Sequence, residues 1–380
     1  MAEMVVEASM ALALGAKLCK PKVIPMYPIT PQTHIVERLA DFINNGELDA
    51  EMLHAESEHS AMAAMIGASA AGVRTYTATS SQGLALMFEL LPIMSGNRLP
   101  GVMSVANRAL SAPISIWNDH SDSVSARDQG WIQLYCESTQ EAIDTTIQLY
   151  KVSENHDVLL PAMVCIDGFT LSHVLERAVI PEQEEVDEFL PEFKPFVKLD
   201  PENPVSIGPI AFPNSFMEFK KQQQDAFEKA MPLIGEVHDE FAKKFGRSYG
   251  NGWIEEYKME DAEYALIGMG TLIGTARVAV DELREKGEKV GLIKLRSYRP
   301  FPAKEIQRAT KNLKGLSVID RHFSLGYEAP LFTEVSSALY DSPLQINSFV
   351  AGLGGRDITV ERLKKALLSV KKGEPGGWLL

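Results

Sequence analysis

Short β-rich runs alternate with helical stretches between residues 23 and 167, and this alternation restricts the possible folds more than any other feature of the sequence. The predicted strands are Val23–Tyr27, Glu51–Ala55, Thr75–Thr79, Gly101–Ala106 and Leu160–Ile166. The predicted helices between them include Thr33–Ile43, His59–Ala71, Gly83–Met94 and Thr139–Val152. This order predicts an α/β fold with a doubly wound parallel sheet. Ligands of such sheets bind outside the carboxyl ends of the strands.

Polar side chains follow the predicted strands at that edge. They are Thr30, Glu58, Ser80-Ser81-Gln82, Asn107-Arg108 and Asp167. Any one of them alone is more often a cap or a turn residue than part of a site. Their convergence predicts a polar pocket for an anion, in which the guanidinium of Arg108 can bind a carboxylate through two parallel hydrogen bonds.

Glu58 stands where a strand passes into a run of small and apolar residues, Glu58–Gly72, which we expect to form a helix buried nearly all round. Glu56 and Glu58 both fall near its first turn, where carboxylates stabilise the free N–H groups and the helix dipole. Residues two apart project in different directions, so only one of the two is expected to do so. Glu58 is therefore either a cap or a catalytic carboxylate.

A polar loop, Ile116–Gly130, follows Arg108 and contains Asp119, His120 and Asp122. Its spacing matches no metal-binding motif, and a solvated or self-paired loop accounts for its composition. Loops at the ligand edge often contribute to sites, so Asp119 is kept as a second-rank site residue.

Residues 180–215 are acidic and rich in proline, which predicts an extended arm. Apolar residues spaced mostly three and four apart then predict a long helix from Phe216 to Phe245. The segment Gly250-Asn-Gly252 marks the expected boundary between one domain at residues 1–250 and another at 251–380.

The second domain is again predicted to be α/β, with strands near Tyr264, at Val290–Tyr298, Gly315–Ile319 and Ile346–Ala351, and a last helix at Val360–Val370. The glycine-rich turn Gly268–Gly274 suggests a dinucleotide site. However, its spacing is one residue off the fingerprint, and the next strand carries Lys294 and Arg296 where an acid is expected. An ordinary βα turn is the better interpretation.

Charge and cysteine content exclude several classes of partner. The net charge is −14 and no basic patch is present, which argues against nucleic acid and against an anionic membrane. No apolar run can span a bilayer, and the first residues carry acid where a signal peptide needs base, so we expect a cytoplasmic protein. The scattered Cys19, Cys136 and Cys165 predict no disulfide, zinc or iron–sulfur site within the chain.

Five motifs in order carry a resemblance to a known family. They are Tyr27-Pro-Ile-Thr-Pro31, Glu56-Ser-Glu58-His-Ser60, Thr79-Ser-Ser-Gln-Gly-Leu84, Asn107-Arg-Ala-Leu110 and Gly352-Leu-Gly-Gly-Arg-Asp357. Together they resemble the α subunit of 2-oxoacid:ferredoxin oxidoreductases, most closely pyruvate:ferredoxin oxidoreductase (pyruvate synthase). The resemblance implies a pyrimidine-type thiamine-diphosphate-binding domain followed by a domain like the C-terminal domain of transketolase.

The resemblance also implies what partner chains supply. Thiamine enzymes usually hold the diphosphate and its Mg²⁺ through a Gly-Asp-Gly segment, which this sequence lacks. The family expectation is that thiamine diphosphate is shared with a β subunit, and that Mg²⁺ and the [4Fe-4S] clusters lie in partner subunits, among them γ and δ. Coenzyme A is then the co-substrate, ferredoxin accepts the electrons, and the chain is inactive alone.

Residue roles follow from matching the motifs. Glu58 matches the catalytic glutamate that hydrogen-bonds N1′ of the aminopyrimidine, and Thr30 and Arg108 match substrate-binding residues. The cofactor-binding residues are Glu58, Ile29, Ser81 and Gln82, and the second-rank residues are Asn107 and Asp119; no metal ligand is assigned.

The threonine of the first motif implies an ordinary 2-oxoacid rather than oxalate, and pyruvate fits the motifs best. Branched-chain, aryl and 2-oxoglutarate-type 2-oxoacids stay open as alternatives. Two functions from other classes also remain: an NADP-dependent oxidoreductase using the Gly268–Gly274 turn, and a non-catalytic scaffold.

Overall fold

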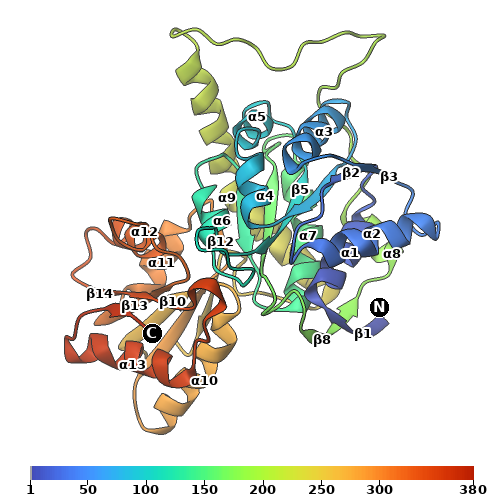
Figure 1. Cartoon of the computed structure of the whole chain (residues 1–380). Helices are drawn as coiled ribbons and strands as arrows, with labels where there is room; N and C mark the ends of the chain where they lie inside the picture. Colours follow the sequence, from blue (N-terminus) through green and yellow to red (C-terminus); the bar gives the residue numbers. More distant parts are fainter. Residues whose placement is uncertain (1) are drawn as a thin grey trace.

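The computed structural model describes residues 2–380, and its N-terminal part is built on a parallel sheet with helices on both faces (Figure 1). The strands of this part are β1 (Ala2–Glu7), β2 (Val23–Met26), β3 (Glu51–His54), β4 (Tyr76–Thr79), β5 (Val102–Asn107), β6 (Ile132–Tyr135), β7 (Ala162–Asp167) and β8 (Leu175–Ile180). Its helices are α1 (Ala8–Cys19), α2 (Thr33–Asn44), α3 (Glu58–Ala70), α4 (Ser81–Met87), α5 (Leu91–Gly96), α6 (Ser121–Ser125), α7 (Thr139–Ser153), α8 (Gln183–Phe189) and α9 (Phe216–Phe245).

The main sheet of this part has the strand order β12-β6-β7-β5-β4, where β12 (Ser297–Arg299) comes from the C-terminal part of the chain. Strands β2 and β3 form a separate parallel pair, which one bridge from Val23 to Thr75 joins to the β4 edge. Pro25 lies within β2 and has no N–H to donate, and its carbonyl instead accepts the Thr77 hydroxyl at 2.7 Å. The sheet therefore continues from β4 to β2 and β3, but the ladder of backbone hydrogen bonds between β4 and β2 is incomplete.

Alternation along the strands explains why both faces are covered. In β5, Val102 and Ala106 belong to one buried cluster, with α1, α2, α7 and α9, whereas Met103 and Val105 belong to another, with α3, α4 and α5. A parallel sheet buried on both faces reads as a nearly continuous apolar run, as β5 does.

The five predicted strands of this part are all present, but several other expectations were wrong. The predicted helix Gly83–Met94 is split into α4 and α5, and helix α1 and the strands β1, β6 and β8 were missed. Helix α3 is buried on one face only, because Ala63 and Gly67 are exposed. A run of small residues has little side-chain contrast between faces, so its sequence does not reveal which side meets solvent.

The predicted arm at residues 180–215 is only partly extended. It begins with α8, whose first turn is held by a capping box between Glu182 and Glu185. Residues 190–215 contain no helix or strand and extend away from the sheet before α9 returns the chain (Figure 1).

The C-terminal part is a second α/β layer with the strand order β15-β14-β13-β10-β11-β9. Its strands are β9 (Ile254–Tyr257), β10 (Tyr264–Gly268), β11 (Val290–Leu295), β13 (Gly315–Asp320), β14 (Gln345–Val350) and β15 (Gly377–Trp378). Its helices are α10 (Leu272–Glu285), α11 (Ala303–Thr310), α12 (Pro330–Ala338), the short η1 (Leu353–Gly355) and α13 (Val360–Lys372).

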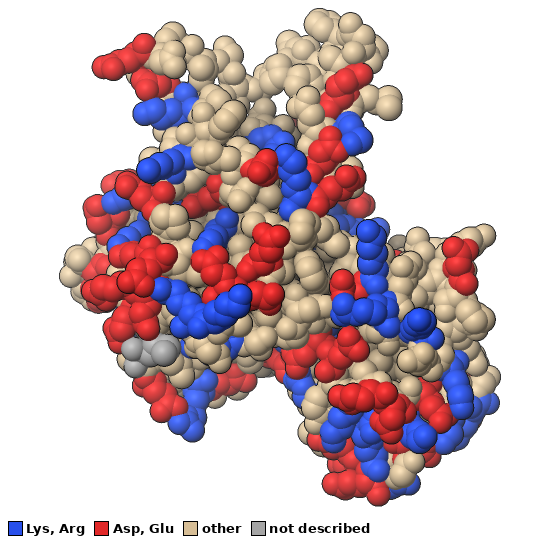
Figure 2. Space-filling model, turned by 180° about the vertical axis from the view of Figure 1, so that it is seen from behind, with Lys and Arg blue, Asp and Glu red and all other residues tan. Residues whose placement is uncertain are grey.

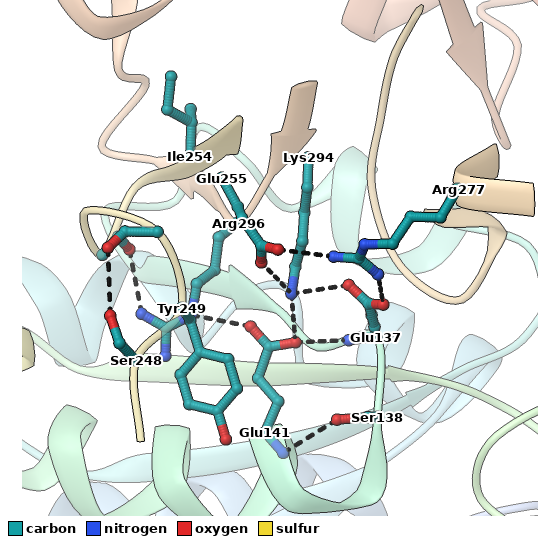
Figure 3. Close-up of polar contacts among 12 residues, drawn as sticks. Glu137, Ser138, Glu141, Ser248, Tyr249, Ile254, Glu255, Arg277, Lys294 and Arg296 are labelled. Carbon is teal, nitrogen blue, oxygen red and sulfur yellow. Dashed lines mark hydrogen bonds and ion pairs between the residues drawn. The ribbon is translucent and has the colours of Figure 1, made fainter. Parts of the chain in front are cut away.

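The predicted strand Val290–Tyr298 is divided, because β11 stays in the second sheet while β12 pairs antiparallel with β6 of the first. Lys294 near the end of β11 and Arg296 between the two strands reach back to Glu141 on α7, at 2.8 Å and 2.9 Å (Figure 3). All three side chains are buried, and buried charges are tolerated only when paired. These basic residues therefore join the two parts of the chain.

Two further properties of residues 2–380 complete the description. Within them, helices are too short or too polar to cross a bilayer. Lysine and arginine are interspersed with aspartate and glutamate over both lobes on the face shown in Figure 2.

Candidate active site

The loop after β2 carries Thr30 and is held in place by hydrogen bonds of Gln32. Gln32 is fully buried, donates from Nε2 to the Ala78 carbonyl of β4 at 2.8 Å, and accepts the Ile29 N–H at 3.3 Å. Gly168 packs beside the same loop, where a Cβ atom would lie 2.7 Å from Pro31 Cγ. The exposed Thr30 side chain therefore stands on a firmly held turn.

Arg108 follows β5 and reaches across to that loop. Its Nη1 donates to the Thr30 carbonyl at 2.9 Å, and its Nε donates to the Ser115 carbonyl at 3.0 Å. The side chain is only 7% exposed, and its Nη2 donates no hydrogen bond within residues 2–380. The two predicted substrate-binding residues are thus neighbours, and one edge of the guanidinium is available for a carboxylate.

Glu58 is the first residue of α3 but is not its cap. Ser57 is the N-cap and accepts the Ser60 N–H at 3.2 Å, while the exposed Glu56 accepts the Ser60 hydroxyl. The Glu58 carboxylate is 7% exposed and makes no hydrogen bond or ion pair with any described residue. Of the two alternatives for Glu58, capping through its side chain is excluded.

The Glu58 carboxylate and the Thr79 hydroxyl fill a recess on α4 that exists because residue 83 is glycine. A Cβ atom on Gly83 would lie 2.7 Å from Glu58 Oε1 and 2.5 Å from Thr79 Oγ1. The Thr79 hydroxyl is fully buried and has no partner among residues 2–380. A buried hydroxyl without a partner is costly to the fold unless another molecule satisfies it, and the Glu58 carboxylate beside it also has no partner among the described residues.

The predicted cofactor residues Ser81 and Gln82 begin α4, across the recess from α3. Ser81 is fully buried in a left-handed backbone conformation with φ of 45°. Its hydroxyl lies 2.7 Å from the Ala109 carbonyl and 2.6 Å from Gln82 Oε1, and its single proton can be donated to either acceptor. The Ser81 hydroxyl is therefore engaged within the chain, whereas Gln82 is partly exposed at the site.

Asp122 is the residue of this site whose part the sequence did not indicate. Its carboxylate accepts the backbone N–H groups of Ser81 at 2.9 Å and Arg108 at 3.0 Å. Burial raises the pKa of Asp122 to about 6, and its N–H donors act against that rise. The two donors lie 41 and 14 residues away in the chain, so no local pattern could have shown the contact.

The second-rank residues bind other groups of the chain. Asn107 donates from Nδ2 to Asp122 at 2.7 Å, and Asp119 accepts the Ser121 N–H at 2.9 Å and the Gly354 N–H at 3.3 Å. The loop containing Gly354 thus contacts the first part of the same chain.

Asp167 follows its strand as expected, but its carboxylate binds the second part of the chain. It accepts the Thr271 N–H at the start of α10 and lies 2.5 Å from Arg321 Nη1 and 2.8 Å from His120 Nε2. Burial alone would raise the pKa of Asp167, but Arg321 and His120 hold it well below the usual range. A carboxylate therefore occupies the helix terminus where a dinucleotide phosphate would bind, which argues against the NADP alternative.

Comparison with solved structures defines the class. A structure of 2-oxoglutarate:ferredoxin oxidoreductase from Magnetococcus marinus, with 2-oxoglutarate, coenzyme A and succinyl-CoA bound, matches 96% of this chain with a TM-score of 0.74 at 18% identity; this chain spans 64% of that one. An inactive β4 tetramer of a split-gene transketolase matches with a TM-score of 0.54 at 12% identity, over 96% of this chain and 98% of that one. The class is thus an α/β protein with a thiamine-diphosphate-binding fold and a transketolase C-terminal-like domain, as the sequence predicted.

Comparison at the sequence level is more specific. The chain belongs to the pyruvate flavodoxin/ferredoxin oxidoreductase family: the family's thiamine-diphosphate-binding model matches residues 14–239, and the model of pyruvate:ferredoxin oxidoreductase core domain II matches residues 262–363. Pyruvate synthase subunit PorA of Methanothermobacter thermautotrophicus is 51% identical over 97% of this chain and 96% of its own length. Ketoisovalerate oxidoreductase subunit VorA of Pyrococcus horikoshii is 46% identical over 99% and 95%.

Proposed function

We propose that the chain is the α subunit of a pyruvate:ferredoxin oxidoreductase, which converts pyruvate and coenzyme A to acetyl-CoA and CO₂ and passes the electrons to ferredoxin. Relatives about 50% identical over nearly the whole chain, named pyruvate synthase subunit PorA, support the reaction. The observation that carries the site assignment is the Glu58 carboxylate, which is buried without a partner beside the recess at Gly83.

The described residues fit thiamine diphosphate. The Glu58 carboxylate and the Thr79 hydroxyl, which have no partner among the described residues, are the groups that a bound molecule would satisfy. Glu58, Ile29 and Gln82 would hold the cofactor, with Ser81 shaping the turn between them. When bound, the cofactor supplies a nucleophilic carbon and an electron sink for decarboxylation of a 2-oxoacid.

The chain's own residues then have distinct tasks. Glu58 would share a proton with the ring nitrogen facing its carboxylate, because a carboxylate shielded from water exchanges a proton efficiently with a neighbouring base. Arg108 would bind the substrate carboxylate through its unused Nη2 edge, and the Thr30 hydroxyl would bind from the opposite loop. Held in this way, the reacting carbon needs no further reorientation.

Partner subunits would complete the enzyme. The names of the relatives as subunits, the absence of a Gly-Asp-Gly segment and the three buried, scattered cysteines support placing Mg²⁺ and the [4Fe-4S] clusters in β, γ and δ subunits. The ends of the two family matches, at residues 239 and 262, support the domain boundary near residue 250.

The test uses the complex that co-purifies with a tagged copy of the chain under anaerobic conditions. Viologen reduction is measured with pyruvate, 2-oxoisovalerate and 2-oxoglutarate, each with and without coenzyme A. We expect reduction that requires coenzyme A and has its highest kcat/KM with pyruvate. Faster turnover of 2-oxoisovalerate would move the assignment to the branched-chain enzyme, the activity named for the VorA relative.

The Glu58→Gln variant tests the catalytic residue within the same complex. We expect kcat to fall about 10²–10⁴-fold, because the amide cannot take up the proton, while the complex still assembles. Glu56→Gln is the matched control, since Glu56 is an exposed carboxylate two residues away, and it should keep wild-type turnover. Full activity of Glu58→Gln would contradict the assignment.

A further inference from the structure

One carboxylate oxygen joins the two loops that form the substrate side of the site. Asp122 Oδ2, on the short helix α6, accepts the N–H of Ser81, where α4 begins, and the N–H of Arg108, where β5 ends. Asp122 is 3% exposed and lies behind both loops. The relative position of Ser81 and Arg108 therefore depends on a side chain from a third segment.

The other oxygen of the same carboxylate is equally occupied. Asp122 Oδ1 accepts the Asn107 Nδ2 group at 2.7 Å and the Ser123 N–H at 2.7 Å. Within residues 2–380 Asp122 forms no ion pair with lysine, arginine or histidine, so N–H donors alone compensate its buried charge. An acceptor-only group surrounded by donors cannot be replaced by an amide without setting donor against donor.

We propose that Asp122 is a positioning residue for the 2-oxoacid: by holding the Ser81 and Arg108 backbones together, it aims the Arg108 guanidinium at the substrate carboxylate. The inference rests on the proposed function and names a residue that does not touch the substrate. Arg108 Nη1 and Nε are fixed on the Thr30 and Ser115 carbonyls, so a shift of its backbone changes the direction of the free Nη2 edge. Binding that is equal in ground and transition states appears in KM rather than in kcat.

The first test is Asp122→Asn in the complete complex. The amide keeps the size of the side chain, but its NH₂ group must face either the Ser81 and Arg108 N–H groups or Asn107 Nδ2 and Ser123 N–H. We expect KM for pyruvate to rise about 10–100-fold, the scale of a misplacement of about 1 Å, with kcat and the KM for coenzyme A nearly unchanged. A purely structural role would instead lower the active fraction, and hence kcat, at constant KM.

A reciprocal exchange provides the rescue. In Asn107→Asp/Asp122→Asn the amide at 122 can donate to a carboxylate at 107 and still accept from Ser81 and Arg108, and only the Ser123 N–H still faces a donor. We expect the KM of the double variant for pyruvate to be at least about tenfold lower than that of Asp122→Asn, since the donor–acceptor pairing between 107 and 122 is restored.

Asp320→Asn is the matched control. Asp320 is also a buried carboxylate that accepts backbone N–H groups, those of His322 at 3.0 Å and Leu331 at 2.5 Å, but it lies in the second part of the chain. It should leave KM for pyruvate unchanged. An unchanged KM in Asp122→Asn, or an equal rise in Asp320→Asn, would overturn the inference.

Hydrogen exchange of the full chain gives a readout independent of turnover. The backbone amides of Ser81 and Arg108 should exchange faster in Asp122→Asn than in the wild type, whereas those of β7 should not change. Wild-type protection at both amides would overturn the inference even if the variant complex fails to assemble. A wild-type complex that turns over no 2-oxoacid overturns the proposed function instead, and hydrogen exchange then still decides whether Asp122 holds the loops.

Discussion

Replacing Gly83 by alanine separates activity from stability. Gly83 is the third residue of α4, and an added Cβ would stand 2.7 Å from Glu58 Oε1 and 2.5 Å from Thr79 Oγ1, where ordinary contacts begin at 3.4 Å. The carboxylate must therefore retreat by about 0.7 Å, beyond the tolerance of about 0.5 Å that a catalytic group usually has. We expect kcat/KM for pyruvate to fall about 10–100-fold.

The free energy of unfolding of the same variant should fall modestly, because the buried Thr79 hydroxyl must shift as well. Alanine is favoured over glycine within a helix by up to about 1 kcal/mol, which offsets part of the steric cost of the new methyl group. Gly274→Ala is the matched control, because Gly274 is the third residue of α10 and its added Cβ would meet nothing within 4 Å. Viologen reduction and calorimetry on both complexes give the comparison. Wild-type kcat/KM in Gly83→Ala would refute the claim that the recess positions the Glu58 carboxylate.

Two further predictions concern the fold. Burial raises the pKa of Asp320 to about 7, so the contribution of Asp320 to stability is lost as pH rises from about 4 to 7. Burial lowers the pKa of His322 to about 4, so the contribution of His322 to stability is lost as pH falls from about 6.5 to 4. The two slopes oppose each other in the wild type. Between pH 4 and 6.5, acidification should therefore lower the Tm of Asp320→Asn more than that of the wild type, and lower that of His322→Gln less. Parallel Tm profiles for the three proteins would contradict this. Glu141→Gln leaves Lys294 and Arg296 buried without their shared carboxylate and should reduce the free energy of unfolding in urea by about 3–5 kcal/mol. The control Glu240→Gln breaks the surface pair with Lys151 and should cost at most about 1 kcal/mol. Equal losses would show that the buried network is not required.

The sequence by itself determined the fold class and the family. Strand and helix periods are local properties, so five of the eight strands of the first part were predicted with end errors of at most two residues. The five motifs also identified the family, which the comparisons confirm. The prediction that polar residues at the carboxyl ends of the strands lie close together holds for Thr30 and Arg108, which are in contact. A parallel sheet brings those strand ends to one edge.

Only the tertiary structure decided how the edge residues are used. Asp167 binds Arg321 and the start of α10, and Lys294 binds Glu141, because the second part of the chain packs against the first and buried charges must find partners there. Asp122 accepts from Ser81 and Arg108 across 41 and 14 residues, and the space beside Glu58 depends on Gly83 of a different helix. Such contacts join segments that are distant in sequence, so local periodicity and propensity contain no record of them.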